Sequence, residues 1–388
     1  MRLWRDASLS AIAAGFVTVL VGYTSSVALI FQATQALGAT PSQVTSWLWA
    51  LGIGMGVTCI GLSLRYRVPV ATAWSTPGAA MLITAVAGVS MGEAVGAFVV
   101  AALLMAICGF AGLFERVTRH IPAPLASAML AGVLLRFGLD AFRSMQTQWW
   151  LCFGMFVTYL VMRRLSPRYA VVVTLLVAVV IAAAQGLLHT EQVRLAVAMP
   201  EFVMPQFSFG ALLGIALPLF VVTMASQNMT GVAVMRAAGY EPPISPVLGW
   251  VGTVNVVLAP FGAFSLGLAA ITAAICMSPE AHEDPKRRYV AAVSAGFFYL
   301  LAGIFAATVA AVMAAFPVEL VVTIAGLALL GTIGNGLAAA LANEAEREAA
   351  LVTFLVTASG LSLLGIGSAF WGLLAGVLVR GVLTFRRA

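Results

Sequence analysis

Apolar runs of about 20 residues recur along this chain and are separated by short polar connections, which constrains the fold more than any other feature. A run of about 20 apolar residues is long enough for a helix to cross a bilayer. Only 9% of the residues are charged, whereas a soluble domain carries about 25%. We therefore exclude a large soluble protein and predict an all-α membrane protein. The first run, residues 9–31, is too long for a cleaved signal peptide and is predicted to be a retained span.

We predict 14 transmembrane segments, of which the third and tenth are interrupted early by proline and glycine. They are residues 9–31, 44–64, 70–88, 92–114, 122–139, 149–162, 169–188, 208–235, 246–259, 262–278, 288–314, 319–341, 349–364 and 366–385. With both termini in the cytoplasm of a bacterium, all Lys and Arg residues except Arg136, Arg143 and Arg194 lie at cytoplasmic ends, as the positive-inside rule requires. Removing the two interrupted segments would turn six arginines outward, so both are predicted to cross the inner membrane.

The two halves of the sequence resemble each other at an offset of 201 residues. Ser25 then meets Ser226, and Trp49 meets Trp250, although chance also produces some identities in apolar sequence. Seven crossings per half is an odd number, so the second half would enter the membrane from the opposite side, as in many secondary transporters. We predict two inverted seven-span repeats, residues 1–190 and 205–388.

The third and tenth segments are predicted to contain short extended stretches followed by half-helices. Residues 68–80 begin with alternating and β-branched residues, and Thr76 with Pro77 resembles a helix N-cap followed by a proline at the first helical position. In the tenth segment, Ser265 or Gly267 is predicted to begin the half-helix. The alternative is that these prolines only kink two otherwise continuous helices.

Extended backbone cannot face lipid unpaired, so the two stretches are predicted to lie side by side at mid-depth. Each half-helix N-terminus then presents N–H groups and a partial positive charge, which suit an anion such as a carboxylate. No Asp, Glu or His lies at the centre of a span. This composition favours an anionic substrate, but it leaves the group that carries a coupled proton unidentified.

Polar and aromatic residues gather around this predicted junction. Gln227 and Asn228 are assigned to hydrogen bonds with a substrate or with the extended stretches, because amides in hydrocarbon need partners. Hydrogen bonding between helices is an equally good alternative. Tyr23, Trp74 and Phe264 are candidates to pack against an aromatic ring, although each is also a typical core residue. The complete candidate substrate-binding set is Tyr23, Ser25, Trp74, Ser75, Thr76, Gly78, Ser226, Gln227, Asn228, Phe264, Ser265, Gly267 and Asn335.

The sequence does not indicate an enzyme or a metal centre. The four cysteines stand singly in apolar segments, without the spacing of a metal site or a disulfide framework. His282 with Glu283 lacks the second histidine of a zinc motif. We therefore predict no catalytic residue, no cofactor, no metal and no nucleic-acid partner, and we expect membrane lipid around the chain.

Several strings resemble the benzoate:proton symporter family, and the resemblance covers essentially the whole chain. They are residues 14–16 (AGF), 21–26 (VGYTSS), 72–80 (TAWSTPGAA), 223–228 (TMASQN) and 365–372 (GIGSAFWG). The combination is specific, whereas any one string alone would be weak.

The resemblance implies the fold of the uracil and xanthine nucleobase transporters. In that fold a core domain would comprise residues 1–114 plus 208–315, and a gate domain residues 120–190 plus 317–388. Substrate would bind between the domains near the interrupted segments, and the core would move relative to the gate. A homodimer is consistent with these fold relatives alone.

Two departures from the family pattern bear on function. Uracil-type relatives carry acidic residues in the eighth and tenth spans, where this chain has Gln227 and small or apolar residues, which argues against a nucleobase. Thr230 stands where a proline is expected, so the bend of the eighth span is in question. We predict a secondary carrier that imports benzoate or a similar aromatic carboxylate with a proton. The alternatives are an anion channel and a carrier for another small organic anion or a nucleobase.

Overall fold

The computed structural model describes residues 6–86, 88–114, 122–166, 170–188, 191, 194–277, 281–361, 363 and 368–385. Helices make up most of this described chain, as the apolar runs predicted. Five helical stretches within it are long and apolar enough to cross a membrane: Leu9–Ala36, Pro41–Tyr66, Met91–Phe110, Phe209–Asn228 and Ile244–Phe261. The total of 14 crossings and the inverted repeat stay predictions.

The described elements are helices except for two short strands, one in each half of the chain. The first half contains α2 (Leu9–Ala36), α3 (Pro41–Tyr66), β1 (Thr72–Trp74), α4 (Thr76–Ala85), α5 (Met91–Phe110), α7 (Ala123–Arg143), η1 (Ser144–Gln146), α8 (Trp149–Leu165) and α9 (Ala170–Ala184). The second half contains α10 (Phe209–Ala211), η4 (Leu212–Ala216), α11 (Leu217–Val222), η5 (Thr223–Asn228), α12 (Met229–Ala237), α13 (Ile244–Leu258), η6 (Ala259–Phe261), β2 (Leu266–Leu268), α14 (Ile271–Met277), η7 (Pro285–Arg287), α15 (Tyr289–Ile304), α16 (Ala306–Ala314), α17 (Val318–Leu341), η8 (Glu344–Glu346), α18 (Arg347–Ala358) and α19 (Ser368–Phe385).

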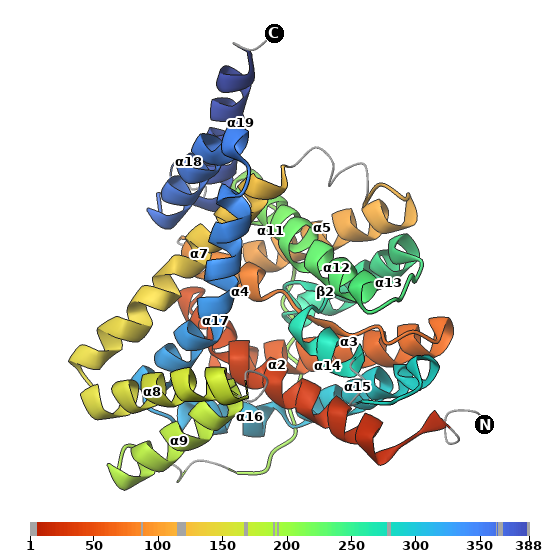
Figure 1. Ribbon diagram of the computed structural model, residues 1–388, viewed down its shortest axis with the longest axis vertical. Coiled ribbons are helices and arrows are strands. Elements are labelled where there is room, and N and C mark those ends of the chain that lie inside the picture. Colours follow the sequence, from red (N-terminus) through yellow and green to blue (C-terminus); the bar gives the residue numbers. More distant parts are fainter. Residues whose placement is uncertain are drawn as a thin grey trace.

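Two groups of helices make up the molecule (Figure 1). In the first group, α2 to α5 and α11 to α15 surround the two strands, with α15 packed against α2 and α3, and α13 against α5. In the second group, α7 packs against α17 and α18, and α8 against α9. The groups meet where α7 approaches α4 and η5, and where α17 approaches α2. The division into a core and a gate domain stays a prediction.

The element η5 departs from α-helical geometry in the middle of an otherwise continuous helix. Residues Thr223–Asn228 form a π-helical turn, as do Leu212–Ala216 in η4. Such turns inside α-helices are uncommon and frequently mark functional sites. The sequence left the bend of the eighth span in question because Thr230 replaces an expected proline. The helix is irregular just before Thr230, whose side chain lies outside the described part.

Candidate functional site

The two interrupted segments meet as an antiparallel pair of strands. Ala73 in β1 lies opposite Gly267 in β2, with Thr72 opposite Leu268 and Trp74 opposite Leu266. Two further backbone bonds extend the ladder, from the Ser75 N–H to the Ser265 carbonyl (2.9 Å) and from the Ala269 N–H to the Ala71 carbonyl (3.0 Å). The pairing satisfies backbone groups that would be costly to bury alone. The prediction that these segments meet is confirmed, and the alternative of two kinked continuous helices is wrong.

The half-helices begin at other residues than those predicted. Ser75 is the N-cap of α4, because its Oγ accepts the Gly78 N–H (3.1 Å), so Thr76 is the first helical residue rather than the cap. In the tenth segment, Ser265 precedes the strand and Gly267 lies inside it, so neither begins a helix. The helix α14 starts only at Ile271. The helix α4 therefore begins at Thr76, earlier than predicted, whereas strand pairing delays the start of α14.

The first turn of α4 uses most of its own N–H donors. Pro77 has no N–H, Gly78 donates to the Ser75 Oγ, and Ala79 donates to the Ser75 carbonyl (2.8 Å). Thr76 is left as the one residue of this turn whose N–H has no acceptor among the described atoms. The expected cradle of free amides for an anion is thus reduced at α4 to a single donor.

Three buried hydroxyl groups join the two strands to η5. The Oγ1 atom of Thr223 lies 2.7 Å from the Oγ of Ser265, and it donates more weakly to the Oγ of Ser75 at 3.4 Å. All three side chains are buried. Sequence reasoning assigned Ser75 and Ser265 to the site and missed Thr223, although this residue opens the string TMASQN.

The amides of Gln227 and Asn228 hold the end of β2. The Gln227 Nε2 donates to the Leu268 carbonyl (3.0 Å), and the Asn228 Oδ1 accepts the Leu268 N–H (2.8 Å). The sequence left the partners of Gln227 and Asn228 open between a substrate, the extended stretches and other helices. In the structure both amides bind the extended stretch β2. Gly267 fits between these amides, because a Cβ there would lie 2.8 Å from the Asn228 Oδ1 and 2.9 Å from the Gln227 Cγ.

An aromatic pair lies beside β1. Tyr23 on α2 packs edge-to-face against Trp74, with ring centroids 4.8 Å apart, and the Trp74 indole N–H donates to the Ser26 Oγ (2.8 Å). The buried Tyr23 hydroxyl has no hydrogen-bond partner among the described residues. Tyr299 on α15 completes the cluster, 6.2 Å from Tyr23 between ring centroids. Sequence reasoning missed Tyr299, because an aromatic residue in an apolar span carries no local signal of function.

The other predicted site residues lie in several places. Gly78 and Ser226 are buried beside the junction, on α4 and η5. Phe264 is fully buried against Trp47 and Phe98, with ring centroids 5.8 and 6.4 Å away. Asn335 is exposed on α17, and the side chain of Ser25 lies outside the described part. The structure therefore brings most of the predicted residues together and places Phe264 and Asn335 apart from the aromatic pair.

Exposure differs among the junction residues. Ser75, Asn228 and Trp74 are buried, whereas Thr76 and Gln227 are partly exposed. Thr76 lies on α4 and Gln227 lies on η5. Both of these elements contact α7, which belongs to the second helix group. The accessible polar atoms of the junction therefore belong to the elements at the boundary between the two groups.

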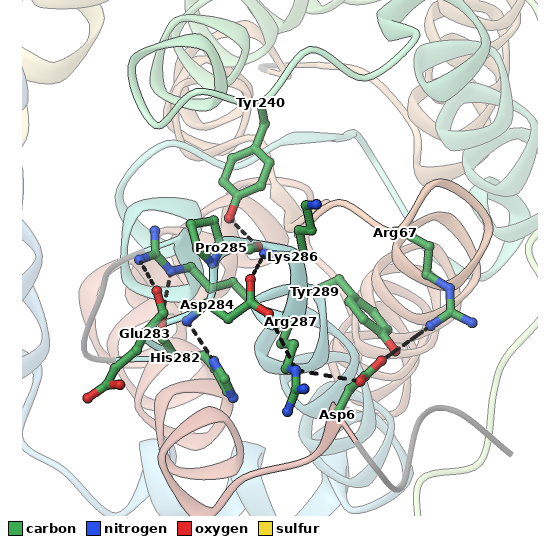
Figure 2. A network of polar contacts seen from close by, with 11 residues as sticks. Asp6, Arg67, Tyr240, His282, Glu283, Asp284, Pro285, Lys286, Arg287 and Tyr289 are labelled. Carbon is green, nitrogen blue, oxygen red and sulfur yellow. Dashed lines mark hydrogen bonds and ion pairs between the residues drawn. The ribbon is translucent and has the colours of Figure 1, made fainter.

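A second polar cluster lies at the end of the first helix group where α14 ends and α15 begins (Figure 2). The guanidinium of Arg288, which is buried, donates to the carbonyls of Met277 (2.8 Å), His282 (2.7 Å) and Glu283 (3.3 Å). It thereby caps the C-terminus of α14 with a positive charge, which favours the helix dipole.

The same cluster ties the start of the chain to two other segments. Asp6 accepts a hydrogen bond from the Tyr289 hydroxyl (2.8 Å) and lies 3.6 Å from Arg67 and 3.8 Å from Arg287. Arg67 also lies over the Tyr289 ring, 4.9 Å from its centroid. Nearby, Tyr240 donates to a backbone carbonyl, and burial raises the pKa of its phenol. We call these residues, with Arg288, the end network.

One sequence pattern that is associated with catalysis has a structural role. Gly88 to Gly92 carries the spacing Gly-x-Ser-x-Gly, but Ser90 is the N-cap of α5 in a capping box with Glu93. No group of three or more His, Cys, Asp or Glu side chains that could hold a metal lies in the described part of the chain.

Comparison with known proteins identifies the family of this chain. Residues 5–382 match the sequence family described as benzoate membrane transport protein (BenE). The chain belongs to this family. Over 363 residues, this BenE-family chain is 54% identical to the inner membrane protein YdcO of Escherichia coli K12. The match covers 94% of this chain and 93% of that protein. It is 38% identical over 381 residues to the benzoate membrane transport protein of Acinetobacter baylyi, covering 98% and 97%.

Solved structures show the same fold for the BenE-family chain. The transmembrane domain of a cyanobacterial bicarbonate transporter, BicA, aligns with a TM-score of 0.62 and 12% identity, covering 95% of this chain and 97% of that one. SLC26A9 aligns with a TM-score of 0.67 and 11% identity, covering 97% and 66%. A murine SLC26A9 structure, described as an anion transporter in the inward-facing state, aligns with a TM-score of 0.64 and 12% identity, covering 98% and 69%.

These comparisons revise one expectation and support another. The implied likeness to uracil and xanthine transporters is not supported by the aligned structures, which are a bicarbonate transporter and SLC26A9. The chain is a multi-pass helical membrane protein, and its family and structural neighbours are transporters rather than enzymes.

Proposed function

We propose that this chain is a secondary active transporter that imports benzoate or a similar aromatic carboxylate together with a proton. It works in the bacterial inner membrane with both termini in the cytoplasm. The observation that carries the proposal is the pair of interrupted segments meeting at the centre of a BenE-family chain. The 38% identical Acinetobacter protein, named for benzoate transport, supports the substrate class.

The proposed substrate site lies at the junction, on the side of α4 and η5. The Tyr23–Trp74 pair offers aromatic edges for the substrate ring. The Thr76 amide and the partly exposed Gln227 offer polar contacts to its carboxyl group. Residues Ser75, Gly78, Ser226, Asn228, Ser265 and Gly267 shape and hold this surface, and Ser25, Phe264 and Asn335 stay predicted contributors.

The arrangement suggests how the site moves. Gln227 and Asn228 bind both backbone groups of Leu268, and the Ser75–Ser265 backbone bond joins the two segments. The strands, α4 and η5 are thereby linked into one unit, which we propose moves against the second helix group. Such movement of one part against the other exposes a central site to each side in turn.

Uptake of labelled benzoate into proteoliposomes with an inward-directed proton gradient tests the function. We expect accumulation that depends on the gradient, and uptake indifferent to it would remove the coupling. Gln227→Ala should reduce uptake at least about tenfold, because it removes a polar contact at the site and leaves the Leu268 carbonyl unpaired. The matched control is Gln146→Ala, at an exposed position in η1.

Counterflow separates a carrier from a channel. A carrier preloaded with unlabelled benzoate takes up labelled benzoate faster, since the loaded site returns across the membrane more readily than the empty one. A channel instead conducts current without this exchange. Faster exchange supports the proposed carrier, and current without exchange contradicts it.

A further inference from the structure

We infer that the coupled proton crosses the membrane on the carboxyl group of the substrate, so that the junction holds the aromatic acid in its neutral form. The inference rests on the proposed function and adds the chemical form of the bound substrate. On the outer side one carboxylate oxygen gains a proton from water as the acid binds. On the inner side the same O–H bond breaks and the proton returns to water, so each transport cycle moves one anion and one proton.

The first observation is that the junction is built from neutral polar groups. Its side-chain hydrogen bonds come from the hydroxyls of Ser75, Thr223 and Ser265 and from the amides of Gln227 and Asn228. The segments that form the junction contain no Asp, Glu, His, Lys or Arg. These segments are residues 18–34, 70–86, 209–235 and 262–277. The polar environment therefore offers dipoles to a guest, and no fixed charge.

The titratable groups packed around the junction are neutral at physiological pH. They are phenols and thiols: Tyr23 on α2, Cys59 on α3, Cys108 on α5, Cys276 on α14 and Tyr299 on α15. The ordinary pKa values of these groups are about 8.5 for a thiol and about 10 for a phenol. A carboxylate guest would therefore find no cation among them.

The charged residues of the neighbouring helices lie outside the segments that form the junction. On α7, Asp140 pairs with Arg143 (3.0 Å) and lies 3.6 Å from Arg136. On α19, Arg380 pairs with Glu346 (2.8 Å). On other packed elements, Arg65 lies in the last turn of α3, 5.8 Å from the Tyr66 ring centroid, and Glu93 forms its capping box with Ser90. Glu319 lies at the start of α17, exposed Arg163 lies on α8 near Gly331, and the side chain of Arg236 on α12 lies outside the described part.

The second observation is the shortage of free backbone donors at the start of α4. A carboxylate has about four acceptor sites and no donor, whereas a neutral carboxyl group has one O–H donor and accepts fewer bonds. At α4, capping by Ser75 and the absence of an N–H on Pro77 leave only the Thr76 amide. The unpartnered Tyr23 hydroxyl is able either to donate or to accept. The groups that α4 and Tyr23 offer therefore match a neutral carboxyl group better than an anion.

Electrostatics decides between the two forms. A carboxylate buried without a cation and with few donors costs so much free energy that the group takes up a proton instead. Binding therefore raises the pKa of the substrate carboxyl group above its solution value of about 4. The bound state contains the proton, so affinity is greatest at low pH and is lost as pH rises above the pKa of the free acid.

Isothermal titration of the purified full-length protein in nanodiscs tests this inference at pH 5 and pH 7. The apparent Kd of benzoate, expressed in total acid, should rise about a hundredfold, because the neutral fraction falls tenfold per pH unit above a pKa near 4. Benzamide, a neutral molecule of similar shape, should bind equally at both pH values and so controls for titration of the protein. Benzenesulfonate, which stays anionic, should not compete. An unchanged benzoate Kd, or competition by benzenesulfonate equal to that of benzoate, overturns the inference.

A variant with a cation at the junction should bind the anionic form of the substrate instead. Thr76→Lys places a cation at a partly exposed position of the junction, and benzoate should then bind with a Kd that no longer rises between pH 5 and pH 7. A hundredfold rise that persists in this folded variant would count against the charge argument. If the variant fails to fold, the wild-type titration still decides.

The two proposals fail in different ways. Proton-driven benzoate uptake together with a pH-independent Kd removes only the neutral-acid inference. Absence of binding and uptake for benzoate and its substituted forms, at both pH values, removes the proposed function itself.

Discussion

The strand junction and the end network hold helix ends in opposite ways. At the junction, buried hydroxyls and amides bind one another and the backbone of two strands. In the end network, partly exposed Asp6, Arg67 and Arg287 carry full charges near one another. Ser75, Asn228 and Ser265 of the junction are buried, whereas the charged groups of the end network are partly exposed, so an unpaired charge costs far more free energy at the junction. Burial therefore requires the junction to be neutral, whatever its role as a site.

The short helix α14 connects the two regions. It begins just after β2, beside the amides that hold Leu268, and the carbonyl oxygen of its last residue, Met277, accepts a hydrogen bond from Arg288. One end of this helix is thus fixed by neutral groups and the other by a cation. A change at either end tests how the two regions tolerate charge.

The largest effect should follow from placing a charge in the neutral region. Asn228→Asp replaces the amide nitrogen of a fully buried side chain by oxygen. Among the described residues this nitrogen donates to the sulfur atoms of Met105 and Met224. The uncompensated carboxylate should cost about 3–5 kcal/mol of stability, measured as a fall in the thermal unfolding temperature in detergent. Asn343→Asp is the matched control, since Asn343 is an exposed N-cap where aspartate serves equally well. Equal unfolding temperatures for both variants would contradict the comparison.

A smaller but clear effect should follow from adding one methyl group at the junction. Gly267→Ala places a Cβ 2.8 Å from the Asn228 Oδ1, which forces the amide away from Leu268. We expect benzoate uptake to fall about tenfold, because a lost buried hydrogen bond costs about 1–3 kcal/mol. Gly61→Ala is the control, since the site around its Cβ is open. Unchanged benzoate uptake in both variants would show that the close packing of Gly267 against Asn228 is not needed for transport.

Some of this junction could be predicted from sequence, and the reason lies in particular residues. Proline, glycine and β-branched residues in the third and tenth segments disfavour helix locally, so the extended stretches and their pairing were predictable. The exact helix starts were not, because Ser75 and Thr76 are both good caps and only the pairing of Trp74 with Leu266 decides between them.

Other features depend on contacts that no local pattern records. The partners of Gln227 and Asn228 were open between substrate, strand and helix until Leu268 was located beside them. Tyr299 reaches the aromatic pair only because Gly22 lacks a side chain, since a Cβ there would lie 2.9 Å from the Tyr299 hydroxyl. The use of the Gly78 amide by Ser75 likewise appears only in the folded chain, and it removes one of the free amides that were expected to hold an anion.

The smallest effect should follow from removing a charge in the end network, by Asp6→Asn. The Tyr289 hydroxyl keeps an oxygen acceptor, and Arg67 and Arg287 remain partly exposed to water, so the loss should be about 0–1 kcal/mol. Uptake should be unchanged, and the small difference in unfolding temperature should shrink further at high salt, which screens exposed charges. Asp6→Asn and Asn228→Asp exchange the same two groups in opposite directions. If Asp6→Asn destabilises the protein as much as Asn228→Asp does, then solvent exposure does not explain why one region is charged and the other neutral.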